Sequence, residues 1–144
     1  QDILLGLQEE LHKTILFITH DLDEALRIGE NIAILRDGLV VQKGNPQEII
    51  LNPADKYVTD FIKDINRGRV LKVSSIMESK KLKNGPEIDR NTILEDALQI
   101  ISKSGAKSAV VTKDGESVGS VEITRMIDAI VRPDKTSEEA SNYH

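Results

Sequence analysis

The chain has no cysteine, no tryptophan and few aromatic residues of any kind. The absence of cysteine excludes disulfide bonds and thiolate metal sites. Aromatic residues make up only 3% of the 144 positions, whereas hydrophobic residues make up 39%. A core must therefore be built from Ile, Leu, Val and Ala, and the length suffices for one ordinary domain or two small ones.

Long hydrophobic runs are absent as well. No stretch approaches the roughly 20 apolar residues of a membrane-spanning helix, so a role at a membrane requires a separate membrane subunit. The net charge is −5, which argues against nucleic acid as a partner because phosphate backbones bind basic surfaces. The three histidines, His12, His20 and His144, are too scattered along the sequence to indicate a metal site, and we expect none.

The most informative residue is His20, which follows an apolar stretch over residues 14–19. That stretch is typical of a strand buried on both faces. Asp21 and Glu24 have the spacing of a capping box, so a helix is predicted to begin directly after His20. Open α/β sheets bind ligands where strands end and helices begin. The spacing alone leaves open whether His20 is functional or merely packed.

Glycine and proline residues mark the turns and helix starts of the elements that follow. Asp37-Gly38 joins two short apolar runs and is a strong hairpin signal. Pro46 suits the first turn of a short helix. Residues 53–65 then have the apolar periodicity of an amphipathic helix.

This order resembles the end of an ABC-transporter ATPase. The resemblance rests on Phe17–Asp21 with the helix after it, on the hairpin over residues 33–44, and on Pro46–Ile49. In that family the His at the place of His20 is the switch residue at the γ-phosphate. The resemblance therefore implies a catalytic role for His20 in an intact ATPase. Residues 53–58 are most similar to importers of glycine betaine, proline and related compatible solutes.

Other parts of that family do not occur in this sequence. It contains no Gly-x-x-x-x-Gly-Lys-Ser/Thr phosphate loop, and neither the signature sequence nor the acidic metal-binding strand is found. We therefore interpret residues 1–65 as the C-terminal part of the ATPase domain and expect no ATP hydrolysis by the chain alone. ATP and Mg are expected only in an intact parent protein. The resemblance also implies a membrane permease as partner and a peripheral location at the cytoplasmic face of the membrane.

Residues 66–72 are predicted to be a linker. The overlapping stretch of residues 67–83 carries six basic side chains against a single acidic one, Glu78. One interpretation is a solvated loop. The other is an electrostatic contact with anionic lipid or an acidic partner, which salt would weaken.

A second pattern covers residues 73–131. An apolar stripe predicts a helix over residues 94–103, Asp114-Gly115 joins two predicted strands, and a last apolar helix follows. The order β-α-β-β-α resembles one cystathionine-β-synthase (CBS) motif. Such motifs work in pairs, and a lone copy leaves an apolar face uncovered, so we expect a two-fold homodimer.

The ligand chemistry departs from nucleotide-binding CBS motifs. Those motifs place a Ser or Thr and then an Asp where this sequence has Glu122 and Arg125. Glu122 would repel a phosphate, and Arg125 has no acceptor for a ribose hydroxyl. We therefore favour a packing or dimerisation role over binding of an adenine nucleotide or cyclic dinucleotide, and expect no tightly bound cofactor. The candidate residues of a regulatory cleft are Ile76, Met77, Ala109, Val110, Thr124 and Arg125.

Together these patterns predict an α/β chain with two parts. The first is a remnant of an ABC ATPase domain (strand–His–helix, hairpin, helices), whose predicted strand over residues 14–19 would lack a partner on at least one edge. Because exposed edges invite pairing, we expect residues 1–65 to be partly disordered or self-associated. The second part is the single CBS motif, followed by a flexible acidic tail over residues 132–144.

Two functions are compatible with this organisation. The favoured one is the regulatory C-terminal portion of an osmolyte importer's ATP-binding subunit. In that case the CBS part mediates dimerisation or senses ionic strength or a nucleotide. The alternative is a stand-alone CBS-type sensor or dimerisation module with no role in a transport ATPase.

Overall fold

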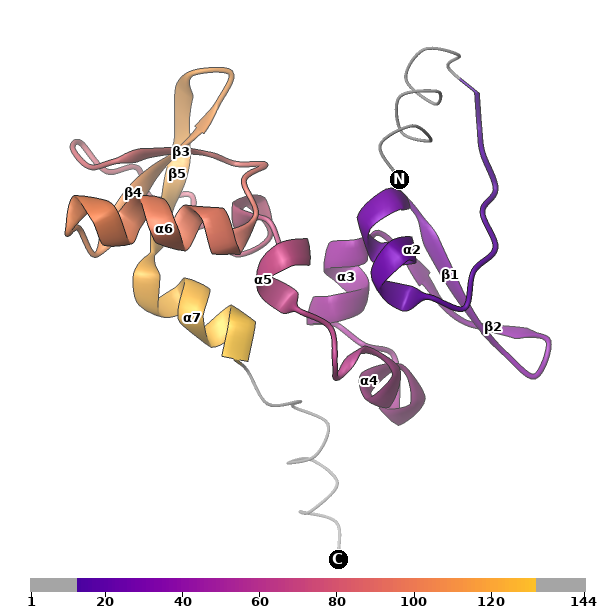
Figure 1. Ribbon diagram of the computed structural model, residues 1–144. Coiled ribbons are helices and arrows are strands. Elements are labelled where there is room, and N and C mark those ends of the chain that lie inside the picture. Colours follow the sequence, from indigo (N-terminus) through magenta and orange to yellow (C-terminus); the bar gives the residue numbers. More distant parts are fainter. Residues whose placement is uncertain (1–12, 132–144) are drawn as a thin grey trace, which may run out of the picture.

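The computed structural model describes residues 13–131 of the chain. Two halves follow one another in space as in sequence, with a hairpin and short helices in the first and a three-stranded sheet in the second (Figure 1). We call residues 22–62 the N-terminal half and residues 73–131 the C-terminal half. The acidic tail predicted over residues 132–144 lies outside the described residues.

The apolar segment over residues 14–19 does not form the predicted strand. Leu16 and Ile18 are each 87% exposed, and no described strand pairs with the segment. A strand exists only through its ladder of hydrogen bonds to a neighbour. An apolar sequence alone is therefore not enough to form a strand. In the predicted strand–His–helix unit, the helix is present and the predicted strand is wrong.

Helix α2 (Leu22–Ile28) begins where its capping signal predicted. The Asp21 side chain accepts a hydrogen bond from the Glu24 backbone N–H at 3.2 Å. The second half of the capping box is replaced, because the Asp21 N–H donates to Thr19 Oγ1 instead, at 3.0 Å. The cap therefore orders the chain on both sides of His20.

The first hairpin has the predicted turn. Strands β1 (Ile32–Arg36) and β2 (Leu39–Gly44) pair antiparallel. Asp37 and Gly38 between them both have positive φ angles, 52° and 76°. Two consecutive residues in this conformation make the tight turn that matches the twist of antiparallel strands.

Two short helices complete the N-terminal half. Helix α3 (Pro46–Leu51) has a full capping box between Asn45 and Glu48, and it buries Ile49 and Ile50 completely or nearly so. The box satisfies backbone donors that the first turn leaves open. Its six residues are thus held at the start by the cap and along one face by the core.

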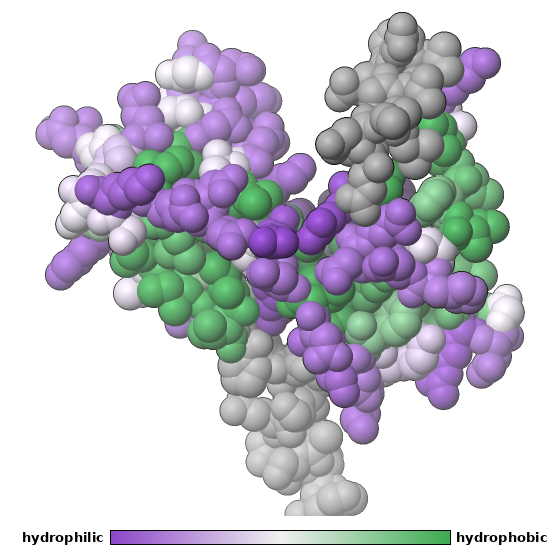
Figure 2. All heavy atoms as spheres, in the orientation of Figure 1, coloured by the Kyte–Doolittle hydropathy of each residue, from purple (hydrophilic) through white to green (hydrophobic). Residues whose placement is uncertain are grey.

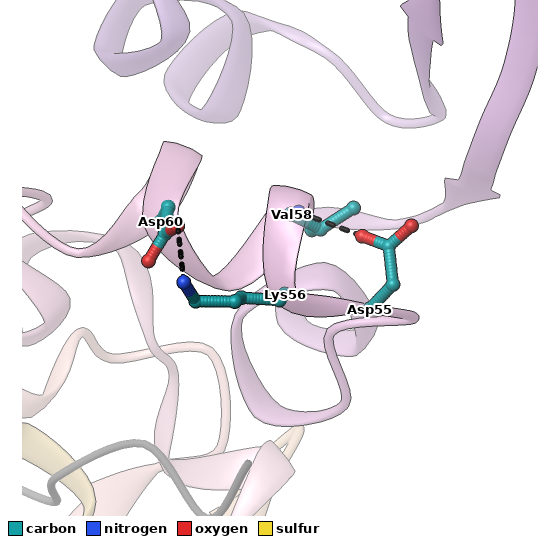
Figure 3. Close-up of polar contacts among 4 residues, drawn as sticks. All are labelled: Asp55, Lys56, Val58 and Asp60. Carbon is teal, nitrogen blue, oxygen red and sulfur yellow. Dashed lines mark hydrogen bonds and ion pairs between the residues drawn. The ribbon is translucent and has the colours of Figure 1, made fainter. Parts of the chain in front are cut away.

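Helix α4 (Lys56–Ile62) forms the central part of the amphipathic helix predicted over residues 53–65. Asp55 caps it by accepting from the Val58 N–H at 2.9 Å, as Figure 3 shows. On the outer face Lys56 lies 4.0 Å from Asp60, an exposed pair of little energetic weight.

The C-terminal half is a mixed sheet with two helices. Strand β3 (Glu87–Asp89) runs parallel to β4 (Ser108–Lys113), and β4 pairs antiparallel with β5 (Glu116–Glu122). The strand order is therefore β3-β4-β5. The other elements are the 3₁₀ turn η1 (Val73–Ser75), α6 (Leu94–Ser104) and α7 (Ile123–Val131), so the chain follows the predicted order β-α-β-β-α. The first strand lies at residues 87–89 and not near residue 73, where the predicted pattern begins and where η1 forms instead.

One continuous apolar core joins the sheet, the helices and the N-terminal half. Its largest buried side chains are aliphatic, as the composition required, and the buried aliphatic residues lie on every element of the C-terminal half. The completely or almost completely buried members in this half include Ile88, Leu94, Ile101, Val111, Val121 and Met126.

The segment predicted as a linker is packed. Residues 66–72 contain helix α5 (Arg67–Val70), and Val70 and Leu71 are 6% and 0% exposed. In Figure 1 this helix lies between α3 and the pair α6 and α7. The prediction failed because most residues of 66–72 are polar. Since Val70 and Leu71 belong to the core, the segment joins the two halves instead of separating them.

Candidate functional site

The residues predicted for a regulatory cleft are only partly brought together. Met77 and its neighbour Glu78 run alongside β5, next to the first turn of α7, which carries Thr124 and Arg125. Met77 is partly buried, and Thr124 and Arg125 are exposed.

The other predicted cleft residues serve packing. Ile76 is 7% exposed and belongs to the main core, as does Ala109. Val110 follows Ala109 in β4, so their side chains point to opposite faces of the sheet. Only one of the two can therefore face a given cleft, and Val110 lies beside Gly85, apart from the main core.

Glu78 pairs through its backbone with the outer edge of β5. Its N–H donates to Ser120 O at 2.8 Å, and its carbonyl accepts from the Ser120 N–H at 2.9 Å. This approach is possible because position 119 is a glycine. A Cβ there would collide with the Glu78 carbonyl oxygen and lie 2.7 Å from Met77 Cε.

Arg125 is engaged by a carboxylate of its own chain. Its Nη1 lies 2.7 Å from Glu78 Oε1, and both side chains are about half exposed, at 50% and 47%. A pair this exposed contributes at most about 1 kcal/mol to stability. An anionic ligand at Arg125 would have to compete with the Glu78 carboxylate. No local pattern indicates this contact, because the two residues are 47 positions apart.

The basic stretch over residues 67–83 divides into two groups. Arg67 and Arg69 are used within the fold: Arg67 donates to Ile50 O at 2.8 Å, and Arg69 lies 3.3 Å from Glu95. The four lysines of the stretch are exposed to solvent instead: Lys72 precedes η1, and Lys80, Lys81 and Lys83 lie in the loop before β3.

His20 is exposed and stands immediately before the N-cap Asp21. Its position at the start of a helix agrees with the sequence, although the strand expected before it is absent. In the described range 13–131, no group of three or more His, Cys, Asp or Glu residues could hold a metal ion. No helix in that range is long and apolar enough to cross a membrane.

Comparison with known proteins identifies relatives along nearly the whole chain. A glycine betaine/carnitine transport ATP-binding protein of Listeria monocytogenes is 40% identical over 145 residues, which is 98% of this chain and 34% of that protein. A trimethylamine N-oxide transport ATP-binding protein of Pelagibacter ubique is also 40% identical, over 94% of this chain and 40% of that protein. The chain is homologous to ATP-binding subunits of ABC importers for glycine betaine, carnitine and choline.

This homology confirms the resemblance inferred from the sequence. The glycine betaine/proline betaine subunit of Escherichia coli is 46% identical over 85 residues, or 59% of this chain and 21% of that protein. The chain spans 40% or less of the length of these three relatives, and the aligned stretch is their C-terminal portion. No protein-family model matches the chain.

Solved structures give weaker likenesses. An uncharacterised conserved protein from Pyrococcus horikoshii is 20% identical with a TM-score of 0.32, covering 74% of this chain and 72% of that one. The CBS domain of a bacterial CNNM/CorC family Mg²⁺ transporter in complex with ATP is 14% identical with a TM-score of 0.29, covering 90% and 72%. At these scores the likeness establishes neither fold nor ligand.

The close approach at Gly119 yields a stability prediction. Gly119→Ala forces the Glu78 backbone away from β5, and overpacking of this kind costs typically about 1–3 kcal/mol. We expect the free energy of unfolding to fall by that amount in denaturant titrations. Gly68→Ala is the matched control, because a Cβ at that position has its nearest neighbours at 3.5 Å. Equal stability of the two variants would contradict the described contact.

Proposed function

We propose that this chain is the regulatory C-terminal portion of the ATP-binding subunit of an ABC importer for glycine betaine, proline or a similar osmolyte. The observation that carries the proposal is 40% identity over 98% of the chain to a glycine betaine/carnitine transport ATP-binding protein. Other relatives are ATP-binding proteins of transporters for choline and for glycine betaine/proline betaine. All of these except trimethylamine N-oxide are quaternary ammonium compounds, so the transported solute belongs to that chemical class or resembles it.

In this proposal His20 and the N-terminal half that follows it complete an ATPase site. His20 is the switch residue, and it acts only when the rest of the ATPase supplies the phosphate loop with ATP and Mg. Its exposure and its place before a capped helix support the role, because a residue that contacts a nucleotide phosphate must be reachable. The permease of the importer is then the membrane partner, and the chain works at the cytoplasmic face of the membrane.

The C-terminal half mediates dimerisation, senses ionic strength, or does both. An apolar surface lies over α7 (Figure 2), where Ile127 and Val131 are 44% and 66% exposed. A second copy of the chain would cover it, as expected for a lone CBS motif. The exposed lysines of the loop before β3 provide charge that salt can screen.

A nucleotide is the weaker candidate for the regulatory signal. Glu78 already occupies Arg125, and any ligand regulates only by binding two states with different free energies. The alternative function, a stand-alone CBS-type sensor or dimerisation module, gains no specific support because the homology covers the N-terminal half as well.

Transport activity tests the proposal directly. We predict that this chain, replacing the aligned C-terminal portion of the Listeria monocytogenes glycine betaine/carnitine subunit, supports uptake of glycine betaine in cells that lack that subunit. The same chimera with His20→Ala should lose uptake, whereas Asp23→Ala, on the exposed side of α2, should retain it. A chimera that assembles with the permease but transports nothing, or an active His20→Ala chimera, contradicts the proposal.

Light scattering coupled to size exclusion tests the role of the C-terminal half. We predict a dimer that Ile127→Asp converts to a monomer, because a charge on the exposed face of α7 cannot be buried without cost. Adenine and cyclic dinucleotides should leave the mass unchanged. Asp128→Asn, on the same helix, is the control. A wild-type monomer at every salt concentration would contradict dimerisation.

A further inference from the structure

One glutamine of the N-terminal half holds the chain that enters the C-terminal half. Gln47, in the first turn of α3, donates from Nε2 to Val70 O at 2.9 Å and accepts at Oε1 from the Lys72 N–H at 2.8 Å. The two bonds flank Leu71, which is completely buried. A single side chain thus satisfies a backbone donor and a backbone acceptor on both sides of a core residue.

The other end of α3 is tied to the same place. Arg67, at the start of α5, donates from Nη2 to Ile50 O at 2.8 Å. Carbonyls in the last turn of a helix lack partners within the helix, so this bond satisfies one of them. Helix α3 is therefore fixed to α5 at its beginning through Gln47 and at its end through Arg67.

The segment held by Gln47 is equally bound to the C-terminal half. Leu71 O accepts from the Leu94 N–H at 2.9 Å, and the Val73 N–H donates to Thr92 O at 2.9 Å. On the surface, the Arg69 side chain reaches Glu95 in α6 at 3.3 Å. The backbone of residues 70–73 thus belongs to both halves at once.

We propose that Gln47 is a positioning residue that locks the two halves into one rigid body. With both bonds in place, a displacement of the sheet or of α6 is carried through α5 to α3 and the N-terminal half. Without them, two backbone groups beside a buried residue lose their partners, a cost of the kind that favours local opening. If the lock carries a regulatory signal from the C-terminal half to the N-terminal half, that role rests on the function proposed above. The rigid connection of the two halves does not depend on that function.

The chain contains a matched control for this lock. Gln42 donates from Nε2 to Asn52 O at 3.0 Å and accepts at Oε1 from the Ala54 N–H at 2.9 Å. Its chemistry is the same as that of Gln47, but both of its partners lie within the N-terminal half. Gln42→Ala therefore removes equivalent bonds without touching the junction.

Distance measurements between spin labels test the proposal on the full chain. Because the sequence has no cysteine, Lys43→Cys and Lys103→Cys place single labels at exposed positions, one in each half. Dilution with unlabelled chain removes distances between copies. We expect a narrow distance distribution in the otherwise unchanged chain and with Gln42→Ala, and a broad one with Gln47→Ala. Gln47→Glu, which keeps only the acceptor for Lys72, should give an intermediate width.

A second label pair separates loss of the lock from loss of the fold. Labels at Lys103→Cys and Glu116→Cys both lie in the C-terminal half, and their distribution should stay narrow with Gln47→Ala. A narrow distribution between the halves in Gln47→Ala, or a broad one in the unchanged chain, overturns the lock. Broadening within the C-terminal half also overturns it, since Gln47 would then be required for folding and not for positioning.

The regulatory use of the lock has a separate readout. In the active chimera with the Listeria subunit, Gln47→Ala should abolish the response of uptake to salt, while Gln42→Ala keeps it. An inactive chimera refutes the proposed function and leaves the rigid lock to be decided by the distances. An active chimera in which Gln47→Ala responds to salt normally overturns the regulatory use alone.

Discussion

The structure depends on the hydrogen bonds of a few consecutive residues between its two halves. The backbone of residues 70–74 is bonded to the Gln47 side chain of α3 and to the chain that leads into α6. Leu71 and Val73, whose side chains are completely buried, lie within this segment. Their own backbone groups are satisfied within the fold, because Leu71 O accepts from the Leu94 N–H and the Val73 N–H donates to Thr92 O. The two halves therefore share one core.

This shared segment bears on how the chain would work in an importer. The homology extends across both halves, from α2 to α7. In the C-terminal half, the exposed surfaces include the apolar face of α7 and the lysines before β3. Arg125 offers less, because Glu78 already pairs with it. Regulation through association and surface charge thus fits this fold better than regulation through a bound nucleotide.

The sequence predicted those elements whose cause is local. Asp37-Gly38 and Asp114-Gly115 both form turns with two positive φ angles, since that conformation is set by the residues themselves. The cap at Asp21 and the apolar stripe of α6 are likewise determined by residues close together in the sequence. Such signals do not depend on contacts with distant parts of the chain.

Elements whose cause is distant could not be predicted in this way. Residues 14–19 have strand composition but no strand beside them, while β3 has a single apolar residue, Ile88, and pairs with β4 across a separation of about 23 positions. The segment 66–72 was mistaken for a linker because its two buried aliphatic side chains, Val70 and Leu71, stand between the basic residues Arg69 and Lys72. The site shows the same limit: His20 stood out by its neighbours, whereas the partner of Arg125 is 47 positions away.

Native-state hydrogen exchange at the shared segment tests most directly whether the two halves are one unit. We predict that the amides of Lys72, Val73 and Leu94 exchange only with the opening that also exposes Ile49 and Val111, the buried centres of the two halves. Equal opening free energies at all five amides, falling together in denaturant, would agree with it. Fast exchange at Lys72 and Leu94 while both centres stay protected would contradict it, because the halves would then open independently.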